Sequence, residues 1–242
     1  MKCVVAAICP EAQIIDITHA IPPFDVRAGA YAVTQAAPFS PPGSIHVVVV
    51  DPGVGTPRRP LGVRSEDRLY LAPDNGVLSW QVNAPNAEIR QLNNDALWLS
   101  TRSATFHGRD LFAPAAAKIA AGICAFEELG PKISDPVLLT NLEAKLDAQG
   151  NWYGAIVSID RFGNVITNVR ASAIKPQNAE YSFQLNGIQI SSFVATFGDA
   201  PPGLPFAYEG SAGYIEIGLN QGNAAAVLGV QAGDPVTLVV NA

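Results

Sequence analysis

The sequence predicts an α/β domain with a largely parallel sheet, followed by a smaller all-β domain. Residues 45–50 hold five apolar residues in six, mostly β-branched, which is typical of a buried parallel strand. Helical and strand patterns alternate around this run, but from about residue 136 only short alternating stretches and turns follow. The polar segment NLEAKLDAQG at 141–150 separates the region of alternating helix and strand patterns from the region of short strands and turns. We therefore expect domains at residues 1–145 and 146–242.

The elements of the first domain follow from local signals. Apolar residues at helical spacing open the chain and end at Cys9-Pro10, and QIIDIT then reads as a strand. Asp25 is a suitable N-cap for the next helix. The sequence PDNG at 73–76 has the composition of a turn. The expected helices are 1–8, Val26–Ala36, 77–82 and 111–121, and the expected strands are 13–18, 45–50, 61–65 and 68–72.

The second domain should consist mainly of short strands. Each expected strand is rich in β-branched or aromatic residues and is bounded by Gly, Asn, Asp or Pro. The five strands that we expect are Trp152–Ile159, 165–169, 181–185, 214–218 and 236–240.

Composition excludes several classes of protein. The 242 residues are 48% hydrophobic and 15% charged, with a net charge of -6, so neither a nucleic acid nor an anionic membrane is an expected partner. Cys3, Cys9 and Cys124 match no paired metal-ligand spacing and indicate reduced thiols. No run of eighteen apolar residues occurs. We expect a cytoplasmic protein without a membrane partner.

The candidate functional segment begins where the run at 45–50 ends. Asp51 is followed by the turn-forming sequence PGVGT and by Arg58 and Arg59. Ligands of α/β sheets bind beyond the carboxyl ends of strands, so an acid and two cations here indicate a site. Two alternatives stay open: Asp51 caps a turn beside solvated arginines, or the loop binds phosphate, although it lacks the lysine of a P-loop.

His107 is the second candidate, because it precedes the expected helix 111–121. The positive end of a helix favours a neutral imidazole. A zinc hydrolase using His19, His46 and His107 lacks any HExxH spacing, and a serine triad of Ser103, His107 and Asp110 lacks a GxSxG elbow.

Two stretches of the second domain combine amides, glycines and an aromatic residue. These are DRFGN at 160–164 and NQGNAA at 220–225, and such groups suit the edge and face of a planar heterocycle. The alternative is a pair of ordinary β-turns.

Taken together, separated motifs over nearly the whole chain resemble the S-adenosyl-L-methionine (SAM) hydroxide adenosyltransferases, relatives of the SAM-dependent fluorinase and chlorinase. The resemblance implies a β-barrel-like second domain, hydrolysis of SAM to adenosine and methionine without a metal or cofactor, and a homotrimer that binds SAM between subunits. The motifs are ICPEAQIIDITHAIPPFDVRAGA (8–30), VVVVDPGVGTPRR (47–59), APDNGVL (72–78), TFHGRDLFAPAAA (105–117), IDRFGNVITN (159–168), EGSAGYIEI (209–217) and NQGNAA (220–225).

The resemblance also implies the roles of individual residues. The family's catalytic trio corresponds to Asp51, Arg58 and His107, which would hold an attacking water behind C5′. The implied substrate contacts are Phe24 near the methionine moiety, Thr105 and Gly108 near C5′, and Asp160, Phe162, Asn164, Ser211, Asn223 and Ala224 around methionine and adenine.

One departure from the family leaves alternatives open. Its members begin with a strand carrying a TDFG-like motif whose aspartate holds the ribose, and these 242 residues contain no counterpart. We expect an upstream strand, if the natural chain carries one, to be a buried member of the sheet and to improve SAM binding. The rivals are a non-catalytic trimer that binds SAM or adenosine and a SAM-dependent halogenase. Asp51 disfavours the halogenase, because a fixed carboxylate repels halide.

Overall fold

The structure is a computed structural model that describes residues 1–174 and 180–241. The chain divides into two compact units, Met1–Leu139 and Thr140–Ala242, which are described separately below.

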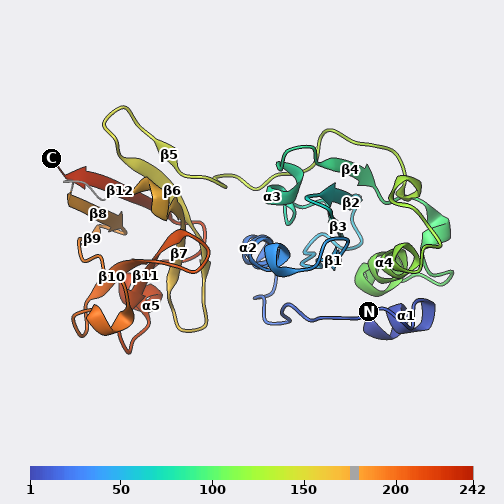
Figure 1. Cartoon of the computed structure of the whole chain (residues 1–242), viewed down its shortest axis with the longest axis horizontal. Helices are drawn as coiled ribbons and strands as arrows, with labels where there is room; N and C mark the ends of the chain where they lie inside the picture. The colour runs from blue at the N-terminus through green and yellow to red at the C-terminus, as the bar shows by residue number, and fades with distance from the viewer. Residues whose placement is uncertain (175–179, 242) are drawn as a thin grey trace. The chain divides into compact units, whose positions relative to one another are not determined.

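The first unit is built on a mixed four-stranded sheet (Figure 1). Only β1 and β3 are parallel, so the expectation of a largely parallel sheet is wrong. The cause is the connection of β2 to β3, in which Glu66 and Asp67 both have positive φ and make a two-residue hairpin that reverses the chain. The sheet order is β1-β3-β2-β4, with β1 at Ile45–Val47, β2 at Pro60–Ser65, β3 at Arg68–Pro73 and β4 at Glu88–Gln91.

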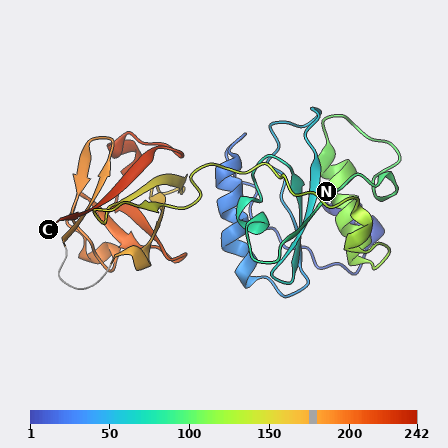
Figure 2. The ribbon, with the colours of Figure 1, turned by 90° about the horizontal axis from the view of Figure 1, so that it is seen from above.

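Helices cover both faces of this sheet. Figure 2 shows α2 on one side and α4 on the other, with α1 beside α4. Successive residues of β3 serve the two faces: Tyr70 is buried with Val33 of α2, and Leu71 is buried with Phe112 next to α4. The helices are α1 Lys2–Ile8, α2 Val26–Ala36, α3 Ser79–Val82 and α4 Ala113–Ala120, with 3-10 turns at Ala37–Phe39, Asp95–Leu97 and Phe126–Leu129 and a π-helix at Gly108–Phe112.

Most of the expected elements are present, including the helix at 77–82 as α3, but some of their bounds differ. Helix α2 has the expected bounds, and its N-cap Asp25 accepts a hydrogen bond from Ala28 N at 2.8 Å. The expected strand at 13–18 is wrong, because these residues form no ladder. The expected strand at 45–50 is shortened to β1, and beyond it Val48 N still donates to Leu71 O at 3.0 Å. The helix expected at 111–121 begins earlier, with the π-helix.

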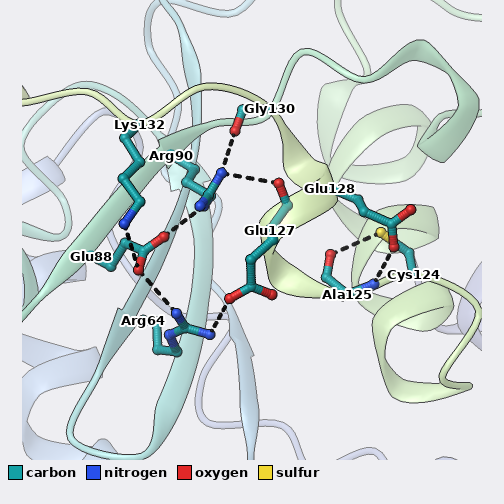
Figure 3. A network of polar contacts seen from close by, with 9 residues as sticks. All are labelled: Arg64, Glu88, Arg90, Cys124, Ala125, Glu127, Glu128, Gly130 and Lys132. Atoms are coloured by element: carbon teal, nitrogen blue, oxygen red, sulfur yellow. Dashed lines mark hydrogen bonds and ion pairs between the residues drawn. The ribbon is translucent and has the colours of Figure 1, made fainter.

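A polar network joins β2 and β4 to the turn Phe126–Leu129 (Figure 3). Glu88 pairs with Arg64 and Arg90 at 3.0 and 2.7 Å, and Arg64 also pairs with Glu127 at 2.7 Å. Both guanidinium groups lie over the buried ring of Phe126, at 4.7 and 5.7 Å from its centre. The network therefore covers one edge of the core.

The second unit is an antiparallel sheet that nearly closes on itself, in agreement with the expected barrel-like domain. The segment after β9 lies along β10, where Ala207 N donates to Ser192 O at 2.8 Å and Val194 N donates to Ala207 O at 3.0 Å. Its elements are β5 Lys145–Leu146, β6 Trp152–Ile159, β7 Val165–Arg170, β8 Glu180–Leu185, β9 Ile188–Ile190, β10 Pro205–Glu209, β11 Tyr214–Leu219, α5 Ala224–Leu228 and β12 Pro235–Asn241, with 3-10 turns at Ala171–Ala173 and Phe197–Asp199.

Candidate functional site

The loop after β1 folds back so that its two ends approach each other. Thr56 N and Oγ1 both bond to Gly53 O, at 3.1 and 2.7 Å. Gly55 has φ +81°, and a Cβ at this position would lie 3.0 Å from Ala104 O. Only glycine suits such a backbone and such a close approach. The loop therefore turns tightly and packs against the segment that leads to His107.

This turn brings Asp51, Arg58 and His107 together. Arg58 Nε donates to Asp51 Oδ1 at 2.9 Å, and Arg58 Nη2 contacts both Asp51 Oδ2 and His107 Nδ1, the latter at 2.7 Å. The Arg58 and Asp51 side chains are 8% and 5% exposed. They form a buried ion pair, so the alternative of a turn-capping acid beside a solvated Arg58 is wrong.

The contact with Arg58 determines the tautomer of His107. A guanidinium group has only donors, so Nδ1 accepts the hydrogen bond and Nε2 carries the proton. Burial lowers the pKa of His107, the positive charge of Arg58 lowers it further, and Asp51 and Asp110 partly oppose both effects. The imidazole is therefore held neutral.

The segment that carries His107 is anchored by the buried carboxylate of Asp110. Its Oδ2 accepts a hydrogen bond from Ser103 N at 2.7 Å, and its Oδ1 accepts one from Arg109 Nε at 2.5 Å. Ser103 Oγ contacts Thr105 Oγ1 at 3.3 Å, and His107 Nδ1 is engaged by Arg58. These partners contradict the serine triad.

Thr105 and Gly108 flank His107 in sequence. Thr105 is exposed, and a Cβ on Gly108 would lie 3.5 Å from Val49 Cγ1. Gly108 thus lies close to Val49, just beyond β1, whereas Thr105 is held by Ser103, whose Oγ accepts a hydrogen bond from Thr105 N at 3.3 Å.

A cleft of about 370 Å³ opens beside Asp51. Its walls are the segment 17–24, the α2 residues Gly29, Ala32 and Val33, and the chain from Val47 to Pro52. Phe24 belongs to this lining, is 76% exposed and has φ +69°, which is rare for a bulky residue and marks a functional candidate.

In the second unit, Asp160 organises the turn between β6 and β7. Its Oδ1 accepts hydrogen bonds from Phe162 N and Asn164 N at 2.8 and 2.9 Å, and its Oδ2 accepts one from Asn164 Nδ2 at 2.8 Å. Asn164 is buried and Phe162 is 79% exposed. The carboxylate thus holds the turn that presents the Phe162 ring.

The second amide-rich stretch lies against this turn. Ala225 N donates to Gly163 O at 2.9 Å, and the Asn223 side chain contacts the position that a Cβ on Gly163 would take. Asn223 also caps α5, whose first residue is the buried Ala224. The first stretch is a turn, as the alternative held, whereas the second is a turn that leads into α5, and the two lie against each other.

Ser211 lies in a neighbouring exposed turn, between β10 and β11. This turn is closed by a hydrogen bond from Gly213 N to Gly210 O at 2.9 Å. Glu216 contacts Gly210 and accepts a hydrogen bond from Tyr208 Oη at 2.5 Å. Burial raises the pKa of Glu216.

Sequence reasoning missed three residues that support these sites: Glu216, Asp74 and Asn75. A single acid between two isoleucines in a strand could have indicated Glu216. Asp74 is buried and pairs with Arg59, so the alternative of a solvated Arg59 is also wrong. In the described parts of the chain, no group of three or more His, Cys, Asp or Glu side chains could hold a metal ion.

Comparison with known proteins identifies the class to which this fold and site belong. The SAM hydroxide adenosyltransferase N-terminal domain matches residues 1–130, and the C-terminal domain of the same family matches residues 154–237. The chain therefore belongs to the SAM hydroxide adenosyltransferase family.

Individual relatives agree with this assignment. The (R)-S-adenosyl-L-methionine hydrolase of Thermus thermophilus is 39% identical over 99% of this chain and 92% of its own, and that of Salinispora tropica is 38% identical over 96% and 88%. A crystal structure of an uncharacterized conserved protein from Thermotoga maritima superimposes with a TM-score of 0.86 at 33% identity, covering 98% of this chain and 92% of its own. Within residues 1–174 and 180–241, no helix is both long and apolar enough to cross a membrane.

Proposed function

We propose that this protein hydrolyses SAM to adenosine and L-methionine. The observation that carries the proposal is the buried trio of Asp51, Arg58 and His107 beside the cleft, in a chain of this family. The trio provides a carboxylate acceptor, guanidinium donors and a neutral imidazole within a few ångströms. Such a set can orient one water molecule and make it more nucleophilic.

In the proposed reaction, the water oxygen attacks C5′ of SAM in line with the C5′–S bond. The bond between oxygen and C5′ forms as the C5′–S bond breaks, and the electron pair of that bond neutralises the sulfonium, which becomes the thioether of methionine. One water proton is lost to the carboxylate of Asp51 and then to solvent. Burial favours the reaction, because the positive charge of the sulfonium and the negative charge of the Asp51 carboxylate are both cancelled in a poorly solvated site.

Two features support the placement of the water near Arg58. Nη1 of Arg58 is buried and has no hydrogen-bond partner among the residues that the structure describes. A buried donor without a partner is uncommon and requires another group to complete it. The Nε2–H of His107 is a second donor that the trio leaves unused.

We further propose that the remaining predicted residues bind the substrate. The first unit contributes Phe24, Thr105 and Gly108, and the second contributes Asp160, Phe162, Asn164, Ser211, Asn223 and Ala224. The exposed Phe162 ring and the Asn223 amide are suited to the face and edge of adenine. In this proposal the protein is a cytoplasmic homotrimer that needs no cofactor, and its domains at 1–145 and 146–242 complete each site between subunits. A monomer in light scattering at micromolar concentration would refute the trimer.

The decisive experiment combines calorimetry with product analysis. The protein is incubated with SAM in isotope-labelled water at high chloride, and the products are separated by chromatography. We expect adenosine that carries the label at its 5′-hydroxyl. A 5′-chloro nucleoside as the main product would indicate a halogenase, and SAM binding without any product would indicate a non-catalytic binding protein.

A further inference from the structure

The turn that follows β3 lies against the loop that carries Asp51 and Arg58. We propose that Asn75 and Asp74 are positioning residues that clamp this loop at its two ends and so keep Arg58 in contact with His107. The measurement of turnover that tests this proposal rests on the proposed function, whereas the measurement of the His107 pKa does not.

Asn75 holds the first end of the loop. Its Nδ2 donates to Val50 O at 2.8 Å, and Val50 O belongs to the peptide group that joins Val50 to Asp51. The Asn75 Oδ1 accepts a hydrogen bond from Val77 N at 3.2 Å, which fixes the side-chain amide from its other end. The backbone before the carboxylate is therefore tied to the turn.

Asp74 holds the second end. Arg59, the residue after Arg58, donates from Nε to Asp74 Oδ2 at 2.8 Å, and its carbonyl accepts a hydrogen bond from Asp74 N at 2.8 Å. Asp74 Oδ1 accepts a third hydrogen bond from Val137 N at 2.8 Å. Asp74 is 5% exposed, so its charge acts in a poorly solvated environment.

Two adjacent residues thus fix both ends of the loop to β3, which lies between β1 and β2 in the sheet. The position of Arg58 relative to His107 depends on these ends, because the loop itself is short and contains two glycines. A displacement of about 1 Å in a catalytic group can lower a rate by roughly 10²-fold. Loss of the clamp should therefore act through Arg58 without removing any member of the trio.

The test compares Asn75→Ala with Asn94→Ala. Asn94 makes the same two kinds of bond elsewhere in the first unit: its Nδ2 donates to Glu128 O at 2.8 Å, and its Oδ1 accepts from Ala96 N at 3.1 Å. Each variant loses one hydrogen bond to a distant backbone carbonyl and one hydrogen bond to a backbone N–H two residues away. We expect similar decreases in melting temperature, but a decrease in kcat of about 10-fold or more with little change in KM only for Asn75→Ala.

The second arm measures the titration of His107 by NMR in the absence of substrate. The chain has only three histidines, so their ring signals can be assigned with single His→Gln variants. Three charged groups act on the pKa of His107: Arg58 lowers it, and Asp51 and Asp110 raise it. Asn75→Ala itself changes no charge. If this substitution lets Arg58 withdraw from His107, the pKa of His107 should rise. The buried His46, stacked on Tyr70, should keep its pKa and serves as the reference.

A milder variant covers the case in which Asn75→Ala does not fold. Asp74→Asn keeps an acceptor for Val137 N but weakens the pair with Arg59. Removing a negative charge would by itself lower the pKa of His107, whereas release of Arg58 would raise it. An unchanged or lowered pKa of His107 in the folded variants, or equal losses of kcat in Asn75→Ala and Asn94→Ala, would overturn the clamp. Absence of adenosine from the wild type would instead refute the proposed function and leave the NMR arm valid.

Discussion

The buried pair of Asp51 and Arg58 should contribute to stability as well as to turnover. Arg58→Ala would leave the Asp51 carboxylate, which is 5% exposed, without the two donors that it now has. Asp51→Ala would likewise leave a buried guanidinium without its counter-ion. Breaking one side of a buried, hydrogen-bonded pair costs about 3–5 kcal/mol. We expect this cost for each single variant.

The double variant Asp51→Ala/Arg58→Ala should be more stable than the sum of the two single effects predicts. Removing both partners leaves no uncompensated charge, so the double variant bears the cost of the vacated volume but not two separate charge penalties. At about 2–4 °C per kcal/mol for a protein of this size, each single variant should lose roughly 6–20 °C in melting temperature. All three variants should lose about 10²-fold or more in turnover.

Urea unfolding followed by tryptophan fluorescence measures these effects, because Trp80 and Trp98 both lie in the first unit. The double-mutant cycle gives the coupling between the two side chains, and adenosine release gives turnover. Additive losses of stability would refute the reasoning, since they would show that neither charge depends on the other. A cost below about 1 kcal/mol for Arg58→Ala would place the pair in solvent.

Three further outcomes follow from the contacts. We expect kcat/KM to fall as the pH drops below 6.5 through the lowered pKa of His107, because protonation of Nδ1 removes the acceptor for Arg58; His107→Gln should abolish this acid limb of the pH–rate profile. Phe126→Ala should cost about 3–5 kcal/mol in urea unfolding, because it removes a buried ring over which two guanidinium groups lie. Glu216→Gln should raise the melting temperature at neutral pH more than near pH 4.5: the raised pKa of Glu216 means that its contribution to stability is lost as the pH rises through the folded-state value, and Gln still accepts from Tyr208.

The parts of the fold that could be predicted from the sequence are those with local causes. Asp25 and the helical spacing after it determine α2, and alternation determines β6 within its observed bounds. The direction of β3 was not predicted, because it depends on a two-residue turn that lacks glycine: Asp67 tolerates a positive φ, but Glu66 is an uncommon residue there.

The same distinction applies to the site. Asp51 and Arg58 lie seven residues apart around glycines, so composition alone indicated a polar loop. The contact of Arg58 with His107, 49 residues further on, depends on tertiary packing, and only the family resemblance suggested it. The role of Asn75 was missed because a turn sequence does not reveal which distant carbonyl its side chain will meet. The catalytic and binding roles of these residues stay predictions.

A last prediction separates binding from catalysis at Gly163, which joins the two turns of the second unit. Gly163 has φ +88°, and a Cβ there would meet the Asn223 side chain, so Gly163→Ala combines backbone strain with displacement of the proposed adenine contact. Gly187 offers a matched control, because it has φ +76° and nothing within 4 Å of its Cβ position. Each variant should lose about 1 kcal/mol or more from strain. Only Gly163→Ala should also raise the KM for SAM, with kcat nearly unchanged, because the displaced Asn223 acts on the bound substrate and not on the attacking water. An equal KM in both variants, measured by adenosine release, would show that Asn223 does not contact the substrate and that this surface serves the fold alone.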